Sequence, residues 1–342
     1  MGSRAADVKN CQADEPAADK SSRAPTNLGA RRHAIGTQCN GMSRPPFLLC
    51  AVLLSSIVAP AAATLQLPFA SHVDLVALDV CATDRNGAPA AVASGDLAVF
   101  DNGIRQQIVL FSEGERVPLA VTLLVDSSQS MHHGLLGRAV AAATALIDQL
   151  PADSLVEVMS FNQRPEVRYP LGVDHARAGL ALADMAPAGA TALYEAVIVA
   201  IRNQERASRD TNGRYRHIIV LLTDGENTAG WLPFDQVLDE ARRSNVLVYT
   251  VVLPSHDAPD AGPSWRMTQL AVDTGGEIVS ARSGDDLMSI YQRIAANVRH
   301  LYRIGYVPTP LTRDGAWHQV QVRAVEKDLV LRTRTGYYAP YQ

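Results

Sequence analysis

Cysteine is scarce in this chain, and no cluster of basic residues is present. The four cysteines, at positions 11, 39, 50 and 81 of 342 residues, form no CxxC pair and no cysteine and histidine spacing typical of zinc. Their spacing excludes a zinc ribbon, a thioredoxin-type redox site and a disulfide-built scaffold. Lys and Arg number 31 against 35 Asp and Glu, a formal charge of −4, so we expect no nucleic acid as a partner.

The composition is that of a folded protein. Hydrophobic residues make up 47% of the chain and charged residues only 19%. This balance supports a buried core and excludes a wholly disordered chain. At about 150 residues per domain, the length allows about two domains.

The amino-terminal region contains the three parts of a secretory signal peptide. Arg44 precedes the apolar run FLLCAVLLSSIV, and Ala61 and Ala63 follow it as a small-residue cleavage site. The run is too short to cross a hydrocarbon core of ~30 Å as a helix. We therefore predict a signal peptide at 42–63, cleaved after Ala63, and a secreted or periplasmic protein.

The residues before this signal carry no pattern of secondary structure. Residues 1–41 are polar, and we expect them to be disordered or to lie upstream of a true start at Met42. No later stretch approaches 18 apolar residues, so we expect no membrane anchor after cleavage. Cleavage would leave Cys81 as the only cysteine, and its strand-like surroundings predict a buried thiol without a disulfide.

Short strand-like segments occupy both flanks of the mature chain. The amino-terminal segments are VDLVALDV at 73–80, LAVF at 97–100 and IRQQIVLF at 104–111. Asn-Gly pairs at 86–87 and 102–103 are typical of two-residue hairpin turns. After about residue 300 apolar residues again alternate with polar ones, as in the strands expected around 320–324 and 329–333. Since neither flank comfortably builds a core alone, we predict that residues 64–116 and 301–342 pair into one small β-sandwich-like domain.

Between the flanks, residues 117–300 alternate apolar strands with helices. The strand candidates are LAVTLLVD (119–126), SLVEVMSF (154–161), RHIIVLLTD (216–224), NVLVYTVVL (245–253) and EIVSA (277–281). Helical spacing of apolar residues appears at 136–150, 193–201 and 287–298. EVRYPLG at 166–172 indicates an antiparallel edge hairpin. This pattern predicts an α/β fold, a doubly wound and mostly parallel sheet with helices on both faces.

Oxygen-bearing side chains follow two of these strands. Asp126, Ser128 and Ser130 come directly after the first strand, and Asp224 follows the strand at 216–224. If the two strands are neighbours, the four side chains converge at the carboxyl edge of the sheet, where ligands bind in open α/β folds. Thr191, on a loop before a helix, adds a fifth oxygen. Such a set favours Mg²⁺, Mn²⁺ or Ca²⁺ over zinc or copper.

The motif DSSQS at 126–130, followed by Thr191 and then Asp224-Gly225, resembles the metal-ion-dependent adhesion site (MIDAS) of von Willebrand factor type A domains. The resemblance covers residues 118–302. It implies that Ser128 and Ser130 bind the ion directly and that Asp126 and Asp224 act largely through water. Thr191 would switch between direct and water-mediated contact.

By the same resemblance, an Asp or Glu of a protein partner would complete the coordination of the ion. Mg²⁺ is the ion we expect, with Mn²⁺ and Ca²⁺ as alternatives. The flanks are similar to those of a secreted bacterial subgroup of such proteins. The resemblance therefore implies a protein-binding module in which a divalent cation recognises an acidic group.

Two other functions stay open at this point. A metal-dependent hydrolase would use the ion to activate water, but the sequence has no GxSxG or HExxH motif and no obvious general base beside the site. His132 and His133 follow the motif, where a solvated helix start explains them. We therefore expect no enzyme. The third function is a structural envelope component stabilised by its metal; the sequence indicates neither the partner nor the oligomeric state.

Overall fold

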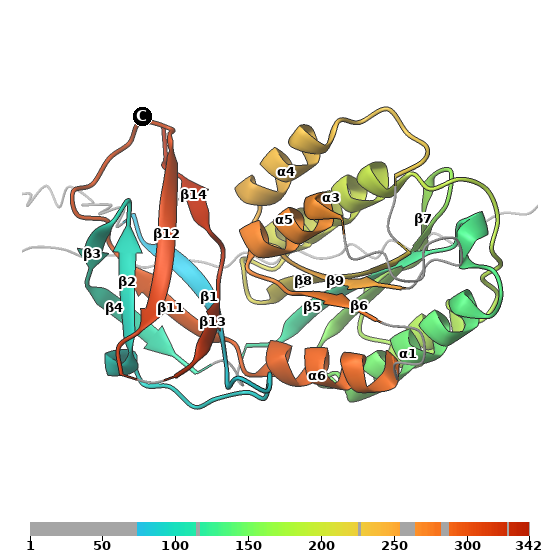
Figure 1. The fold of residues 1–342 in the computed structure, drawn as a ribbon, viewed down its shortest axis with the longest axis horizontal. Coiled ribbons are helices and arrows are strands. Elements are labelled where there is room, and N and C mark those ends of the chain that lie inside the picture. The colour runs from blue at the N-terminus through green and yellow to red at the C-terminus, as the bar shows by residue number, and fades with distance from the viewer. Residues whose placement is uncertain are drawn as a thin grey trace, which may run out of the picture. The chain divides into compact units, whose positions relative to one another are not determined.

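The computed structural model describes residues 74–113, 117–224, 227–253, 264–281, 287–326 and 328–341. The predicted signal peptide at 42–63 and the segment 1–41 lie outside these residues. In the described part of the chain, no helix is long and apolar enough to cross a membrane. The described elements form an α/β domain and a domain of strands alone, which we call the β domain (Figure 1).

The α/β domain is built on one sheet with the strand order β10-β9-β8-β5-β6-β7. Its strands are β5 (Leu119–Asp126), β6 (Leu155–Phe161), β7 (Pro165–Gly172), β8 (Arg216–Thr223), β9 (Leu247–Val252) and β10 (Ile278–Ser280). All neighbours are parallel except β7, which pairs antiparallel with β6. The predicted mostly parallel sheet and its antiparallel edge are thereby confirmed.

Helices cover both faces of this sheet (Figure 1). One face packs against α1 (Leu135–Gln149), α2 (His175–Leu180) and α6 (Leu287–Arg299), and the other against α3 (Leu193–Asp210), α4 (Phe234–Arg243) and α5 (Trp265–Thr274). Every residue of β5 and β8 is buried. Strands buried on both faces have continuous apolar sequences, which is why these two could be located from sequence.

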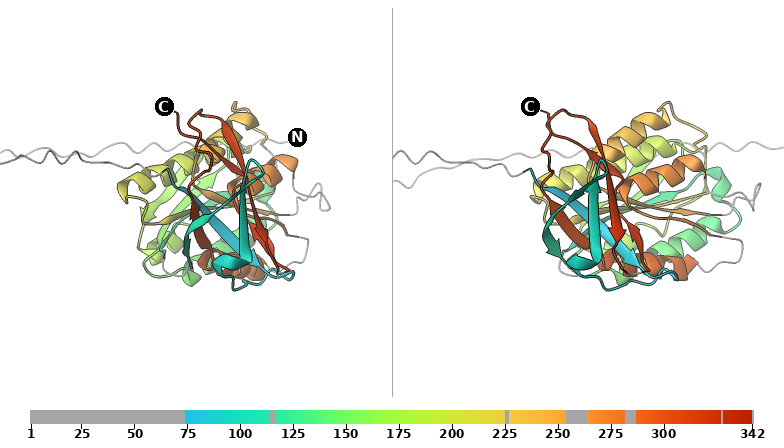
Figure 2. Two further views of the ribbon diagram at one scale, coloured as in Figure 1. Left: turned by 90° about the vertical axis from the view of Figure 1, so that its left-hand side faces the viewer. Right: turned by 60° about the vertical axis from the view of Figure 1, so that its left-hand side comes forward.

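Strands from both flanks pair in the β domain. They are β1 (Val76–Thr83), β2 (Leu97–Asp101), β3 (Ile104–Gln106), β4 (Ile108–Ser112), β11 (Tyr302–Tyr306), β12 (Trp317–Ala324), β13 (Val330–Arg332) and β14 (Gly336–Tyr338). They form two four-stranded sheets, β13-β1-β11-β4 and β14-β12-β2-β3. Figure 2 shows early and late strands of the chain side by side. Apolar side chains of both sheets share one core that includes Leu78, Val99, Ile304 and Val320.

The segment 104–111, expected as one strand, is two strands in different sheets. Ile104–Gln106 pairs with β2, whereas Ile108–Ser112 pairs with β11. The buried Gln106 side chain explains the break, because its amide bonds to Thr309 in both directions, at 3.1 and 2.9 Å, and holds the chain where it crosses between the sheets. The expected turn at Asn102 and Gly103 is confirmed by positive φ angles of 46° and 81°.

One carboxylate joins the two domains. Asp79 of β1 accepts hydrogen bonds from Arg216, the first residue of β8, at 3.0 Å, and from Arg303 of β11 at 3.1 Å. The Arg216 side chain has no exposed surface. Burial lowers its pKa, and Asp79 opposes that effect. The ion pair between Asp79 and Arg216 therefore holds the start of β8 against the β domain.

Candidate metal centre

Asp126 ends β5 at the carboxyl edge of the sheet, where it is fully buried. Its Oδ1 accepts a hydrogen bond from the backbone N–H of Ser128 at 2.8 Å. Its Oδ2 accepts from the hydroxyl of Thr223, the last residue of β8, also at 2.8 Å. The carboxylate is thus held in one orientation by its own loop and by the neighbouring strand.

The loop after Asp126 turns two hydroxyls toward each other. Ser128 directly precedes a short 3₁₀ helix, Gln129–Met131, and its Oγ lies 3.0 Å from Oγ of Ser130. Ser128 is buried, whereas Ser130 is exposed. The backbone N–H and hydroxyl of Ser127 both donate to the carbonyl of Phe161 at the end of β6, at 2.8 and 3.0 Å. These bonds position the serine loop over the sheet edge.

A second loop brings Thr191 to the same edge. The carbonyl of Gly189 accepts from the N–H of Gln129, and the carbonyl of Ser127 accepts from the N–H of Ala188, at 2.8 and 2.9 Å. Two residues after Gly189 lies Thr191, which is buried and precedes α3, as expected from the sequence. The backbone therefore ties the loop of Thr191 directly to the DSSQS motif.

Asp224 follows β8 and completes the set. Because β8 lies next to β5 in parallel register, its end adjoins Asp126. Asp224 is half-buried, and its charge contributes to a raised pKa of Asp126. The chain that continues beyond it returns to Thr191, whose carbonyl accepts from the N–H groups of Thr228 and Ala229 at 3.0 and 2.9 Å.

Burial is the main electrostatic influence on Asp126. Together with the nearby Asp224 carboxylate, burial outweighs the hydrogen bonds from Ser128 and Thr223 and raises the pKa of the carboxyl to about 6. None of the ion pairs between described residues includes Asp126. A buried carboxylate beside a second carboxylate, with no cationic side chain paired to it, is an environment that a cation would stabilise.

The donor chemistry fits a hard divalent cation. The residues brought to this edge offer carboxylate and hydroxyl oxygens, which Mg²⁺, Mn²⁺ and Ca²⁺ accept. Within the described ranges, no group of three or more His, Cys, Asp or Glu side chains could hold a metal. A metal at this edge would therefore depend on the hydroxyls of Ser128, Ser130 and Thr191 in addition to two carboxylates.

The structure adds two residues that the sequence pattern did not indicate. Thr223 bonds directly to Asp126, but in the sequence it ends an apolar run and gives no signal of its own. Glu195, in the first turn of α3, accepts from the N–H groups of Trp231 and Leu232 at 2.7 and 3.2 Å. It holds Trp231, whose side chain is 81% exposed, near the loop that contacts Thr191.

One curated relative matches part of the chain. An uncharacterized protein of Synechocystis sp. is 34% identical over 119 residues, which are 34% of this chain and 27% of that protein. The matched part is thus about a quarter of the relative's length.

Several solved structures align with parts of this chain. BatB from Bacteroides thetaiotaomicron has 20% identity and a TM-score of 0.42 over 53% of this chain and 99% of its own. A von Willebrand factor type A protein from Catenulispora acidiphila has 14% identity and a TM-score of 0.47, over 77% and 74%. Proximal thread matrix protein 1 from the mussel byssus, solved with zinc in its MIDAS motif, has 18% identity and a TM-score of 0.46, over 54% and 48%.

The family match covers the elements that build the site. It starts within β5, includes Asp126 and the serine loop, and ends just after Asp224. Residues 121–226 match the family model described as the von Willebrand factor type A domain.

Proposed function

We propose that this protein is a secreted or periplasmic protein-binding module that uses a divalent cation, Mg²⁺ first of all, to recognise an acidic group on a protein partner. Asp126, Ser128, Ser130, Thr191 and Asp224 would hold the ion. The observation that carries the proposal is the buried Asp126 carboxylate, which lies beside Asp224 and between two loops of hydroxyl oxygens.

The exposure of these residues supports recognition of a partner. Asp126, Ser128 and Thr191 are buried, so they would face the ion from the protein interior, whereas Ser130 lies at the surface. Two carboxylates and three hydroxyls are five oxygen donors, which leave one position of a six-coordinate ion for a carboxylate from outside. The ion would supply the positive charge that such a carboxylate needs.

Export rests on the sequence alone. The proposed signal at 42–63 would be removed during export, and the mature chain would begin at Thr64. Amino-terminal sequencing of the protein recovered from a bacterial host should find Thr64. An amino terminus at Met1 or Met42 in the recovered protein would contradict export.

The first test of the site is thermal unfolding of the full chain with Mg²⁺, Mn²⁺, Ca²⁺ or EDTA. An ion at 100 times its dissociation constant adds about 2.7 kcal/mol to the free energy of unfolding, which raises the unfolding temperature by about 4 °C at this size. We expect this shift in the wild type and its loss in Asp126→Ala and Asp224→Ala.

Asp148→Ala is a matched control. Asp148 is an exposed residue in the last turn of α1, far along the chain from the serine loop, so this variant should keep the full shift. If no ion raised the unfolding temperature of the wild type, or if Asp148→Ala lost the shift as well, the proposed ion site would be wrong.

The second test addresses the acidic group. Binding of short Glu-containing peptides to the full chain would be measured in Mg²⁺ and in EDTA, with peptides in which Gln replaces each Glu as controls. We expect binding only in Mg²⁺ and only to the acidic peptides. Equal binding in EDTA would show that recognition does not depend on the cation.

A further inference from the structure

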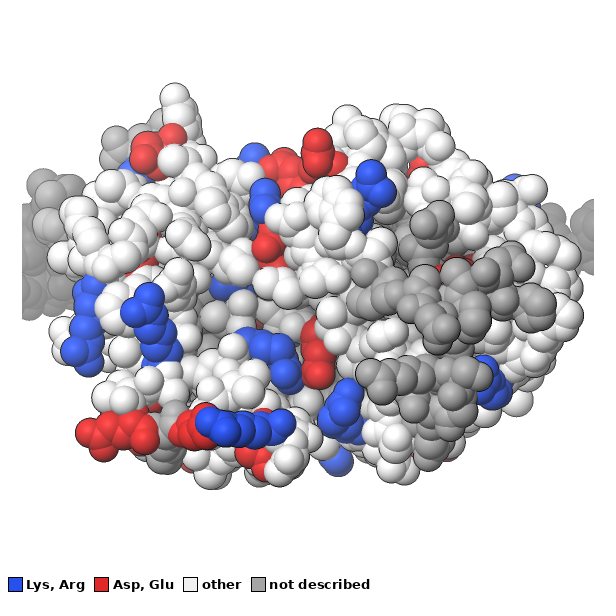
Figure 3. Space-filling view, viewed as in Figure 1, with Lys and Arg blue, Asp and Glu red and all other residues white. Residues whose placement is uncertain are grey.

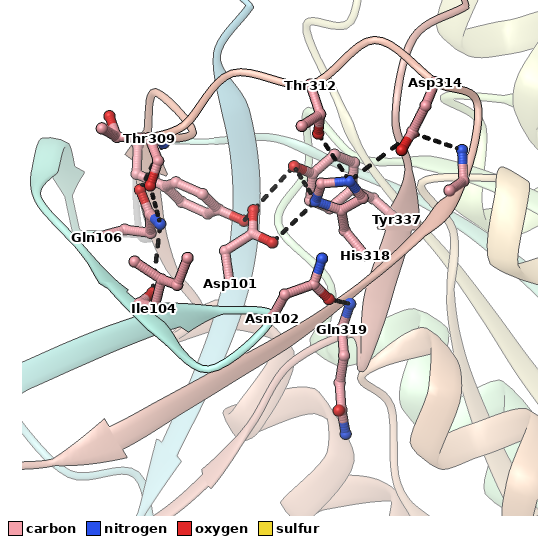
Figure 4. A network of polar contacts seen from close by, with 12 residues as sticks. Asp101, Asn102, Ile104, Gln106, Thr309, Thr312, Asp314, His318, Gln319 and Tyr337 are labelled. Atoms are coloured by element: carbon pink, nitrogen blue, oxygen red, sulfur yellow. Dashed lines mark hydrogen bonds and ion pairs between the residues drawn. The ribbon is translucent and has the colours of Figure 1, made fainter.

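A second polar constellation lies in the β domain. Figure 4 shows Asp101, the last residue of β2, His318 of β12 and Thr312 of the loop between β11 and β12 in one chain of contacts. Nδ1 of His318 lies 2.9 Å from Oδ1 of Asp101, and Nε2 lies 3.0 Å from Oγ1 of Thr312. Asp101 and His318 are buried, whereas Thr312 is half-buried.

The direction of these hydrogen bonds follows from the groups involved. An ionised carboxylate only accepts, so His318 donates to Asp101 through Nδ1–H. The neutral ring then carries its lone pair on Nε2, and the Thr312 hydroxyl donates to it. A hydroxyl, a base and an orienting carboxylate in this order are what nucleophilic catalysis requires.

Two tyrosines fix the carboxylate. The hydroxyls of Tyr306 and Tyr337 both donate to Oδ2 of Asp101 at 2.9 Å, which leaves Oδ1 for His318. Asp314 lies 4.0 Å from Nε2 of His318 and would stabilise the ring when it takes up a proton. The base and its orienting groups are thus held by strands β2, β11, β12 and β14, whereas Thr312 lies on a loop.

Thr312 also borders a cavity. Together with Tyr337 it lines a cavity of about 730 Å³ between the β domain and the α/β domain. This volume is within the range of about 300–1,000 Å³ typical of ligand sites. Leu311 and Pro308 contribute apolar surface to it. The hydroxyl that bonds to His318 therefore belongs to a residue on the wall of a space large enough for a small substrate.

One guanidinium group at this cavity favours an anion. Among the arginines that line it, Arg303 is paired with Asp79 and Arg242 with Asp273. Arg334 donates to Gly336 O, Asn245 Oδ1 and Arg242 O, none of which is charged. Figure 3 shows basic and acidic side chains along the junction of the two domains. Arg334 lines the cavity and has no carboxylate partner among the described residues, so its charge is left for a ligand carboxylate.

We propose that Thr312, His318 and Asp101 form an acyl-transfer site that hydrolyses esters of carboxylate-bearing acyl groups. Oγ1 of Thr312 would bond to the acyl carbon while its proton passes to Nε2 of His318. The ester C–O bond then breaks, and the leaving alcohol takes that proton. Water next attacks the acyl carbon and gives a proton to Nε2. The bond between Oγ1 of Thr312 and the acyl carbon then breaks, the proton returns from Nε2 to Oγ1, and the acid is released.

The test uses the full chain in EDTA with mono-4-nitrophenyl glutarate as the probe, so that it is independent of the metal centre. We expect release of nitrophenolate and a glutaryl group on the peptide that contains Thr312, detected by mass spectrometry. Thr312→Val should lower turnover at least about 100-fold and abolish the label, since removal of a positioned nucleophile or base costs about that much. Thr312→Ser should restore activity.

Thr309→Val is the matched control on the same loop. Among the described residues, the hydroxyl of Thr309 bonds only to the carbonyl of Val307, at 3.4 Å, so this variant should retain turnover. Arg334→Met should raise KM for the glutarate ester more than for 4-nitrophenyl acetate. Equal turnover in Thr312→Val and Thr309→Val, with no glutaryl group on Thr312, would overturn the proposal and leave the network as a structural tie within the β domain.

Discussion

The hydroxyl of Thr223 donates to Oδ2 of Asp126 over 2.8 Å and so links the carboxyl ends of β8 and β5. With Oδ1 engaged by the N–H of Ser128, both carboxylate oxygens have a fixed donor. Thr223 thereby acts on the candidate metal centre from the neighbouring strand, in the way that outer hydrogen bonds orient metal ligands elsewhere.

Replacement of this hydroxyl should weaken ion binding as well as the fold. Thr223→Val leaves the buried Oδ2 of Asp126 without a donor, so we expect a loss of about 2 kcal/mol in the free energy of unfolding. Mg²⁺ affinity should fall about tenfold. Thr250→Val is the control, because the buried Thr250 hydroxyl in β9 has no hydrogen-bond partner among the described residues. Calorimetric titration in which both variants bind Mg²⁺ like the wild type would contradict this role.

The stability of the protein should depend on the protonation of His217. Burial first of all, and then the charge of Arg303, lower its pKa to about 4 against the opposing effect of Asp79. Nδ1 lies 2.7 Å from Oε1 of Gln204. Below its ordinary pKa of about 6.5, histidine in the unfolded chain takes up a proton that folded His217 does not. The contribution of His217 to the free energy of unfolding is therefore constant above pH 6.5. It is lost as the pH falls toward 4, by about 3 kcal/mol in all.

The comparison of wild type with His217→Gln isolates this effect from other titrating groups. Urea unfolding at pH 7.5 and at pH 4.5 should show that the stability advantage of the wild type shrinks by about 2 kcal/mol at the lower pH. An equal fall in the free energy of unfolding of both proteins between pH 7.5 and pH 4.5 would show that His217 does not cause the pH dependence.

The carboxylate of Asp79 should contribute more to the free energy of unfolding than a carboxylate in a partly exposed ion pair. Asp79→Asn removes the charge that faces Arg303 and the fully buried Arg216, so we expect a loss of about 3 kcal/mol. Asp74→Asn, at the partly exposed ion pair with Arg313, should cost less than about 1 kcal/mol. Urea unfolding measures both losses. Equal losses in the free energy of unfolding would show that the burial of Arg216 does not strengthen the contribution of Asp79.

The variant Trp231→Ala tests whether the surface beside the candidate metal centre binds the partner. The exposed Trp231 ring should contribute little to folding, so Trp231→Ala should change the free energy of unfolding by less than about 0.5 kcal/mol. Because exposed tryptophans are frequent anchors in interfaces, acidic peptides should bind about tenfold more weakly. Unchanged peptide affinity, measured by titration in Mg²⁺, would place the partner elsewhere.

The α/β domain was predictable because its strands are buried on both faces. The run LAVTLLVD matches the bounds Leu119–Asp126 of β5, and the apolar spacing at 136–150 corresponds to α1. The sheet switch at Gln107 was not predictable, since IRQQIVLF contains no glycine or proline. There the pairing of Ile108 with Tyr306 and the bonds of the Gln106 side chain to Thr309, both about two hundred positions away in the sequence, decide the structure.

Some of the polar contacts could likewise be predicted from the sequence, and others could not. Asp126, Ser128 and Ser130 stand close together in the sequence, and their pattern alone indicated a site. Thr223 and the bond from Arg216 to Asp79 could not be inferred, because contacts between residues about a hundred positions apart depend on tertiary packing. For the same reason, nothing in the sequence joined Asp101 to His318.

The pairing of β1 with β11 has a consequence for synthesis of the chain. Asp79 and Arg303 lie 224 residues apart in the sequence, and the whole α/β domain is made between them. On the ribosome, β1 and β2 therefore emerge long before β11 and β12, which are their partners, exist. During that interval their edges are open to other chains, so the yield of soluble protein should depend on how quickly translation reaches the last strands.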